Sequence, residues 1–194
     1  LGEKSVYVTA LPDNAVAQAA KASLMHHGVE VKPVFREGRM GIYFLESGAC
    51  QRPSSVIYDR EQSSVSLASP DEYDWKEIFC DADWFHLSGV TPAISENAAL
   101  CSFRAIDEAK KAGCTVSLDL NYRKKLWKWG KRADEVMKLL AKKADVLIAN
   151  EEDIQRVGRI AELLGLAFQI RDDIFDYYPS KDVGKPTGND IREG

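Results

Sequence analysis

The loop at residues 121–125 has the side chains best suited to binding a ligand. It reads NYRKK and directly follows an apolar run at residues 115–120, into which Asp119 is set. A buried strand that ends in hydrogen-bond donors and cations is the usual layout of a binding crevice in an open α/β sheet. One acidic group and several basic groups so placed suit an anionic ligand that carries hydroxyl groups. The alternative is an ordinary loop with solvated lysines, because loops are polar in most proteins.

A second group of chemically active residues lies near the carboxyl end of the chain. Asp172, Asp173 and Asp176 are spaced so that a helix would place all three carboxylates on one face, with Gln169 one turn earlier. Unpaired carboxylates at this spacing repel one another, whereas hard oxygen ligands so placed suit Mg²⁺ that carries a diphosphate. The alternative is a solvated acidic helix face.

Composition limits the classes of function that the chain can have. Its 194 residues are enough for one domain with a real core, and 45% hydrophobic and 29% charged residues are typical of a globular protein. A net charge of −4 argues against nucleic-acid binding as the main function. No apolar run approaches the roughly 20 residues of a membrane helix, and no secretory signal is visible.

The cysteines and histidines indicate neither a disulfide framework nor a zinc site. The four cysteines are widely spaced without a CxxC pair, and only three histidines are present. Reduced thiols in the cytoplasm are the simplest interpretation. His86 falls within a predicted strand, where we expect a hydrogen-bonded core histidine rather than a catalytic one.

Strands and helices alternate along most of the chain. Strands are predicted at residues 5–9, 29–34, 84–87, 115–120 and 145–149, and helices at 15–27, 70–79, 95–112 and 132–143. Asn14 and Ser95 are placed to cap two of these helices, and Gly28 and Gly113 to end them. The alternation predicts a parallel sheet with right-handed crossovers.

Residues 36–68 interrupt this pattern. Short β-like runs at residues 41–45, 55–60 and 64–67 predict a small antiparallel sheet inserted into the α/β domain. Strand alternation directs Tyr43, Tyr58 and Arg60 toward one polar face, as in a lid that covers a ligand. The alternative is that the aromatic side chains simply pack.

Several motifs together resemble one family of enzymes. They are YVTALPDNA (7–15), GIYFLESGACQRPSSVIYDR (41–60), ADWFHLSGVTPA (82–93), SLDLNYRKKLW (117–127) and IANEED (148–153). On these motifs, residues 1–157 resemble the ribokinase-like carbohydrate kinases, and specifically the 2-keto-3-deoxygluconate kinases. The resemblance implies an α/β fold, a partial ribokinase-like three-layer sheet with an antiparallel β lid at about 36–68. It also implies ATP-dependent phosphorylation of a small sugar acid.

The resemblance also implies roles for individual residues. Those expected to contact the sugar acid are Tyr43, Tyr58, Arg60 and Arg123. Asn121 is expected to face the nucleotide, and Asn150 to begin an NxxE motif tied to Mg²⁺ and phosphate. The fourth position of that motif is Asp153, which is one methylene shorter than glutamate.

Two parts of the family pattern do not occur in this sequence. The glycine-rich sugar loop would lie before Leu1, and the GxGD element that supplies the catalytic base is absent. We therefore assign no catalytic residue and expect a fragment with little or no turnover. The lid is the expected site of a homodimer contact.

From about Gly158 the sequence resembles a different family. The motifs FQIRDDIFD (168–176) and GKPTGNDIREG (184–194) are similar to those of trans-isoprenyl (polyprenyl) diphosphate synthases. This resemblance implies Mg²⁺ ligands at Asp172, Asp173 and Asp176, with Gln169 and Lys185 on the diphosphate of a prenyl substrate. It further implies that Asp190 supports the metal site.

The sequence thus predicts residues 1–157 as a partial sugar-kinase domain and 158–194 as an α-helical segment and tail. We expect the helix to dock loosely and the residues after Tyr178 to be irregular. The synthase family needs two aspartate-rich motifs, and residues 1–157 contain no DDxxD. Two alternatives to a kinase remain open: a Mg²⁺-dependent isoprenyl diphosphate synthase fragment, and a non-catalytic fusion or accident of assembly.

Overall fold

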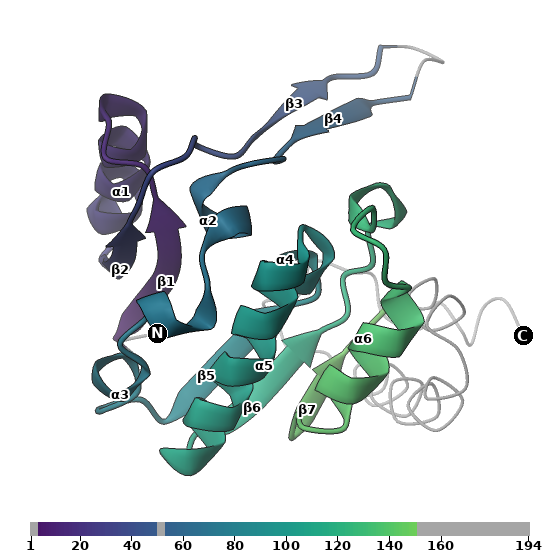
Figure 1. The fold of residues 1–194 in the computed structure, drawn as a ribbon. Coiled ribbons are helices and arrows are strands. Elements are labelled where there is room, and N and C mark those ends of the chain that lie inside the picture. The colour runs from purple at the N-terminus through teal and green to yellow at the C-terminus, as the bar shows by residue number, and fades with distance from the viewer. Residues whose placement is uncertain (1–3, 50–52, 151–194) are drawn as a thin grey trace, which may run out of the picture.

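The computed structural model describes residues 4–49 and 53–150. Strands and helices alternate through both ranges (Figure 1). In chain order they are β1 (Ser5–Leu11), α1 (Ala15–His26), β2 (Val29–Phe35), β3 (Ile42–Glu46), β4 (Ser55–Asp59), α2 (Ser64–Leu67), the 3₁₀ helix η1 (Pro70–Glu72), α3 (Trp75–Ile78), β5 (Trp84–Ser88), α4 (Val90–Ala93), α5 (Glu96–Lys111), β6 (Thr115–Asp119), the 3₁₀ helix η2 (Lys124–Leu126), α6 (Ala133–Ala141) and β7 (Val146–Ile148).

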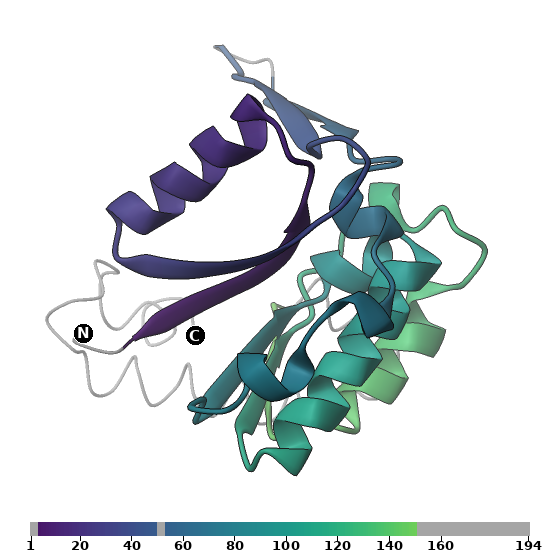
Figure 2. The same ribbon diagram turned by 60° about the vertical axis from the view of Figure 1, so that its left-hand side comes forward.

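The strands within the described ranges form three hydrogen-bonded groups. β1 pairs with β2 in parallel, and β5, β6 and β7 form a parallel sheet in that order. β3 and β4 form an antiparallel pair that projects from the rest of the fold (Figure 1). Figure 2 shows α1 lying along one face of the β1–β2 pair. The α/β class and the inserted antiparallel lid are as predicted.

Local sequence signals set the helix ends. The Asn14 side chain accepts a hydrogen bond from the Ala17 amide at 3.0 Å, and the Ser95 hydroxyl accepts one from the Ala98 amide at the same distance. Each bond satisfies an amide that has no partner within its helix. Gly28 and Gly113 follow α1 and α5 with φ angles of 78° and 86°, which favour glycine. The predicted starts and stops of these helices are confirmed.

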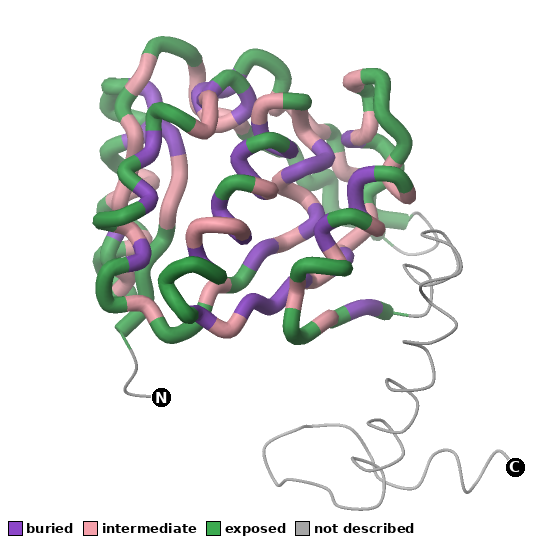
Figure 3. The backbone as a smooth tube through the Cα atoms, turned by 60° about the horizontal axis from the view of Figure 1, so that its bottom comes forward, coloured by how far each residue is buried: buried purple, intermediate pink, exposed green. Residues whose placement is uncertain are grey.

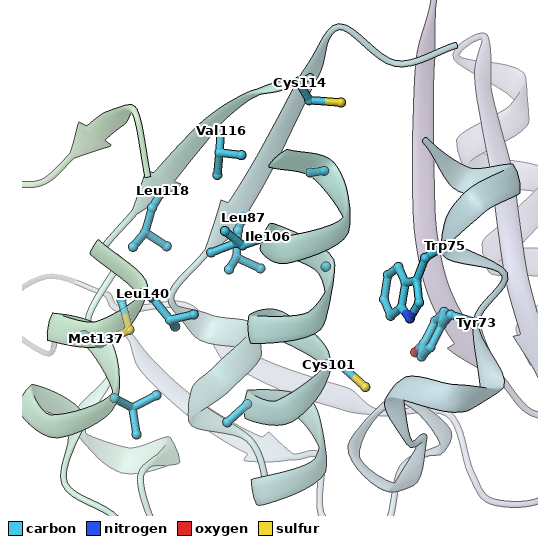
Figure 4. Packing of buried hydrophobic residues seen from close by; sticks show 14 of the residues in the cluster. Tyr73, Trp75, Leu87, Cys101, Ile106, Cys114, Val116, Leu118, Met137 and Leu140 are labelled. Carbon is cyan, nitrogen blue, oxygen red and sulfur yellow. The ribbon is translucent and has the colours of Figure 1, made fainter. Parts of the chain in front are cut away.

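The main core lies between the β5–β6–β7 sheet and the helices α5 and α6. Figure 4 shows Leu87, Val116 and Leu118 of the sheet directed toward Ile106 of α5 and Leu140 of α6. All five are buried, and buried segments are concentrated where α5 meets the sheet (Figure 3). This core fixes the carboxyl ends of β5 and β6, where the site described below begins.

The predicted strand at residues 64–67 is wrong, because these residues form the helix α2. Both serines of this run, Ser64 and Ser66, are buried. The Ser66 hydroxyl donates to the Ser63 carbonyl at 2.8 Å, and the Ser63 hydroxyl donates to the Arg60 carbonyl at 2.7 Å. Short serine side chains bond to nearby backbone in this way and stabilise turns in place of a strand ladder.

Two other expectations need correction. The helix predicted at 70–79 is a 3₁₀ turn followed by the four-residue helix α3. His86 is exposed rather than part of the core, although its Nδ1 lies 2.8 Å from the Ser117 hydroxyl.

Within the described ranges Cys80, Cys101 and Cys114 are free thiols, and no helix combines the length and apolar character needed to cross a membrane. The predictions for residues 151–194, including the boundary at Val157 and the loosely docked helix, lie outside the described residues.

Candidate functional site

The carboxyl ends of β5 and β6 lie side by side because the two strands are parallel and in register. Ser88 lies opposite Asp119 in that register, and the Gly89 amide donates to the Asp119 carbonyl at 2.7 Å. A Cβ atom on Gly89 would lie 2.0 Å from the Leu120 carbonyl oxygen. Only glycine therefore fits at this point, and its absent side chain lets the two strand ends meet.

Asn121 begins the loop after β6 in an unusual backbone conformation. Its φ angle is 37°, in the left-handed region that asparagine tolerates better than most residues. Its side-chain Nδ2 donates to the Ser88 hydroxyl at 3.1 Å, so the loop is tied to the end of β5. Two residues later, Arg123 is exposed, and its Nη1 donates to the Tyr122 carbonyl at 3.2 Å.

The lid contributes the other side of the site. Tyr43 of β3 lies directly opposite Tyr58 of β4, so both side chains fall on one face of the antiparallel pair. The Arg60 guanidinium, just after β4, lies over the Tyr58 ring with its central carbon 5.3 Å from the ring centroid. A planar cation over an aromatic face is a favourable arrangement.

Arg39 anchors the base of the lid. Its Nη1 donates to Asp59 Oδ1 at 2.7 Å and to the Glu61 carbonyl at 3.0 Å, and its Nη2 also bonds the Asp59 carboxylate. The hydrogen bond that Arg39 donates to Asp59 raises the pKa of the Arg39 guanidinium above its ordinary value. These contacts hold Asp59, and with it the end of β4, above the site.

A hollow of about 220 Å³ lies between the lid and the ends of β5 and β6. The residues that line it are Tyr43, Val56, Tyr58, Arg60, Val90, Asn121 and Arg123. Five of these were singled out from the sequence, and the structure brings those five together around one space. Pockets for drug-sized ligands are roughly 300–1,000 Å³. The smaller hollow suits a compact anionic molecule, because two guanidinium groups and an amide line it.

Sequence reasoning did not find the two valines of this hollow. Val56 lies in β4 opposite Leu45, and Val90 begins α4 beside Gly89. An apolar residue in a strand or a short helix has the same pattern whether it faces a ligand or the core, so no sequence signal could have separated them.

A second and larger hollow, of about 500 Å³, lies at the carboxyl ends of β1 and β2. It is lined by Pro12, Asp13, Asn14, Phe35, Arg36, Glu37 and Gly38. None of the predicted site residues within the described ranges lines it. The sequence indicated only a turn and a helix cap at Pro12–Asn14, and Asn14 does perform the capping.

Only some of the predicted nucleotide-binding and metal-binding residues lie within the described ranges. Asn150 follows β7, the neighbour of β6, and it does not line the 220 Å³ hollow. Asp153, Gln169, Asp172, Asp173, Asp176 and Lys185 lie outside the described residues. Within residues 4–49 and 53–150, no group of three or more histidine, cysteine, aspartate or glutamate side chains could hold a metal ion.

Comparison with known proteins places this site in context. The model of the pfkB family of carbohydrate kinases matches residues 1–167. The chain is 39% identical over 160 residues to a 2-dehydro-3-deoxygalactonokinase of Haloferax volcanii, a match covering 81% of this chain and 49% of that protein. The crystal structure of a 2-dehydro-3-deoxygluconokinase from Thermotoga maritima is similar with a TM-score of 0.77 and 39% identity. That match covers 93% of this chain and 56% of the other.

The predicted ribokinase-like α/β fold is confirmed by this likeness. The chain spans about half the length of the curated kinase that it matches. The chain is also 48% identical over 46 residues to a short chain isoprenyl diphosphate synthase of Methanocaldococcus jannaschii. This shorter match covers 23% of this chain and 14% of that protein. The kinase match extends beyond the boundary that the sequence predicts at Val157.

Proposed function

The chain belongs to the pfkB family of carbohydrate kinases, and from this premise we propose that it forms the sugar-binding part of a kinase for 2-keto-3-deoxy sugar acids. The observation that carries the proposal is the convergence of Arg60 and Arg123 on one small hollow. A sugar acid differs from a neutral sugar by its carboxylate. A guanidinium group binds a carboxylate through two parallel N–H···O bonds, and these charge-assisted bonds are stronger than neutral ones.

The other lining residues suit the rest of such a ligand. The phenol groups of Tyr43 and Tyr58 can donate to or accept from sugar hydroxyls. Val56 and Val90 give the hollow an apolar wall, which suits a carbon that bears no hydroxyl group. The named relatives, a 2-dehydro-3-deoxygalactonokinase and a 2-dehydro-3-deoxygluconokinase, support a substrate of this class.

The proposed nucleotide side lies toward β7. Asn121 and Asn150 follow the neighbouring strands β6 and β7. Asn150 would contact the phosphate groups of ATP, and the NH₂ group of Asn121 would donate one of its N–H bonds to them. Bound ATP with Mg²⁺ would supply the γ-phosphoryl group for in-line attack by a sugar hydroxyl. Arg60 and Arg123 orient the acid, and the lid excludes water from it. Since no GxGD sequence occurs in the 194 residues, ligand binding is the appropriate measurement for this chain.

Calorimetry with two ligands tests the proposal. We expect 2-keto-3-deoxygluconate to bind and fructose, a neutral sugar of similar size, to bind at least tenfold more weakly. Replacing Arg60 and Arg123 together by glutamine should abolish this preference for the acid while the circular dichroism spectrum stays unchanged. Equal binding of the two ligands, or a preference that survives the double substitution, would contradict a sugar-acid site.

The outer face of the lid supports a proposal about assembly. Ile42, Phe44 and Ile57 alternate with the residues that face the hollow, and they are 39%, 55% and 61% exposed. Exposed apolar side chains on a two-stranded ribbon favour contact with another surface, and we propose the lid of a second copy as that surface. Light scattering should give a dimer for the wild type and a monomer for Phe44→Asp. A monomeric wild type would rule the contact out.

We also propose a second function for the tail, because its motifs resemble those of isoprenyl diphosphate synthases and 46 residues of the chain are 48% identical to such an enzyme. Residues 158–194 would form a separate segment that binds Mg²⁺ and diphosphate through Asp172, Asp173, Asp176, Gln169 and Lys185. Calorimetry with Mg²⁺ and inorganic pyrophosphate should detect binding in the full chain and its loss in Asp172→Asn/Asp176→Asn. Binding that is unaffected by this double substitution would exclude the aspartates as ligands.

A further inference from the structure

Ser88 connects three elements at the edge of the 220 Å³ hollow. It is the last residue of β5, and its hydroxyl oxygen lies 3.1 Å from Asn121 Nδ2 and 3.4 Å from the Val90 amide nitrogen. Both Asn121 and Val90 line the hollow. One oxygen atom therefore holds two lining residues that belong to different elements, the loop after β6 and the start of α4.

The backbone around Ser88 leaves little room for adjustment. The Gly89 amide is bonded to the Asp119 carbonyl at 2.7 Å, and the Leu120 amide is bonded to the Ile148 carbonyl at 2.9 Å. Main-chain bonds thus fix the residue after β5 and the residue after β6, which is the residue that precedes Asn121. The orientation of the Asn121 side chain is then decided by its own bond to Ser88.

That bond determines which polar atom Asn121 offers to a ligand. A side-chain amide has one acceptor oxygen, Oδ1, and one NH₂ group, Nδ2, which carries two N–H donors. The bond from Nδ2 to Ser88 sets the orientation of the amide, and Oδ1 accepts no hydrogen bond from residues 4–49 and 53–150. A sugar hydroxyl can donate to such an atom, whereas the two nearby arginines can only donate and cannot accept.

We propose that Ser88 is a positioning residue that orients Asn121 so that Oδ1 accepts a hydrogen bond from a hydroxyl group of the bound sugar acid. This inference rests on the proposed function. It adds a hydroxyl-recognising group to the carboxylate-binding arginines, and it assigns Ser88 a role through Asn121 rather than by direct contact with the ligand.

Three single variants test the positioning role by calorimetry with 2-keto-3-deoxygluconate. Ser88→Ala should weaken binding roughly three- to tenfold, as expected for one hydrogen bond. Ser88→Thr keeps the hydroxyl and should restore binding to within twofold of the wild type. Ser102→Ala is the matched control and should leave binding unchanged, since the hydroxyl of this buried serine in α5 donates to the Ala98 carbonyl of its own helix at 2.7 Å. Equal binding by Ser88→Ala and the wild type would overturn the proposal.

A double-mutant cycle separates positioning from a general structural effect. Asn121→Gly removes the amide but tolerates the positive φ angle. In that background, Ser88→Ala should change binding less than twofold, because the group that it orients is gone. A full three- to tenfold loss in the Asn121→Gly background would show that Ser88 acts by another route and would overturn the proposal.

A second readout does not depend on the ligand. In ¹⁵N–¹H spectra of the free protein, the Asn121 side-chain NH₂ signals should shift in Ser88→Ala and return in Ser88→Thr. If the wild type binds no sugar acid, the proposed function fails, and these signals still report whether Ser88 orients Asn121. Unchanged Asn121 signals in Ser88→Ala would refute the orientation itself.

Discussion

The Arg60 guanidinium lies over the face of the Tyr58 ring, with its central carbon 5.3 Å from the ring centroid. Tyr58 in turn lies opposite Tyr43 in the register of β3 and β4. The cation is thus supported by a ring that is held in place by a cross-strand pair. Its position over the hollow is set by the lid, whereas Arg123 reaches the same hollow from the end of β6.

Replacing Arg60 by lysine should weaken the binding of 2-keto-3-deoxygluconate roughly tenfold, although the positive charge is kept. An ammonium group has no planar fork with which to bind a carboxylate bidentately. Lys76→Ala on α3, which removes an exposed cation far from the hollow, is the control and should have no effect. Calorimetry measures both, and equal affinity for Arg60→Lys and wild type would show that Arg60 does not bind the carboxylate through its fork.

Gly89→Ala should destabilise the protein by about 3 kcal/mol or more, because overpacking against a rigid neighbour is costly. The added Cβ atom would lie 2.0 Å from the Leu120 carbonyl oxygen and 2.7 Å from Met137 Cε. Gly113→Ala is the matched control, since nothing lies within 4 Å of its added Cβ and only its φ of 86° is unfavourable. It should cost about 1 kcal/mol. Urea denaturation measures both, and equal losses would contradict the close approach.

Much of the fold and part of the site follow from short-range patterns in the sequence. Alternation with a period of two placed Tyr43 and Tyr58 on one face, and the structure shows them directly opposite each other. Capping residues such as Ser95 marked helix starts, because a side chain bonds an amide three residues away. Both signals depend only on residues close in sequence.

The features that sequence reasoning missed depend on contacts between distant residues. Ser88 lies 33 positions from Asn121, and a serine before a glycine has no periodic signal. The helix at residues 64–67 also receives bonds from residues about 30 positions away, since the Ser95 hydroxyl and the Asn97 amide donate to the Ser66 and Leu67 carbonyls. Such contacts appear only when the chain is folded, so alternation alone gave the wrong element.

Arg39→Ala should loosen the lid without affecting the main core. The side chain bonds the Asp59 carboxylate and the Glu61 carbonyl, and both contacts would be lost. We expect amide exchange at residues 42–46 and 55–59 to become roughly two- to fivefold faster, given the modest strength of exposed ion pairs. Exchange at residues 115–119 should not change.

Arg104→Ala provides the matched control for this measurement. Arg104 forms an exposed ion pair with Glu108 within α5, at 3.1 Å. Its removal should leave exchange in the lid unaltered. Hydrogen exchange followed by mass spectrometry resolves the two regions, and a lid that exchanges at the wild-type rate in Arg39→Ala would refute the anchoring role.

The buried Cys101 thiol should resist alkylation in the folded protein. Burial raises its pKa to about 11 from an ordinary value of 9.0, so little reactive thiolate is present at pH 8. Cys80 is exposed. With iodoacetamide at pH 8, peptide mass spectrometry should show Cys80 modified first and Cys101 modified only after urea is added. Equal rates in the folded protein would mean that the packing around Cys101 opens readily.

The Asp145 carboxylate should stabilise the fold at neutral pH and lose this effect in acid. Its Oδ1 bonds Lys110, and its Oδ2 accepts from the Val116 amide at 2.8 Å. The hydrogen bond from Lys110, followed by that from Val116, lowers its pKa below the ordinary 3.8. A carboxyl group whose pKa is lowered on folding contributes stability above its unfolded pKa, and this contribution disappears as pH falls through the folded value.

Asp145→Asn keeps an acceptor for the Val116 amide but removes the charge. The variant should therefore melt at a lower temperature than the wild type at pH 7, and the two melting temperatures should converge as the pH falls below about 3.8. Asp71→Asn is the control, because Asp71 is exposed and makes no ion pair with the described residues; its difference from the wild type should stay small throughout. Circular dichroism melts between pH 7 and pH 3 measure these differences. A gap between Asp145→Asn and wild type that is constant with pH would show that the charge of Asp145 does not stabilise the junction of α5, β6 and β7.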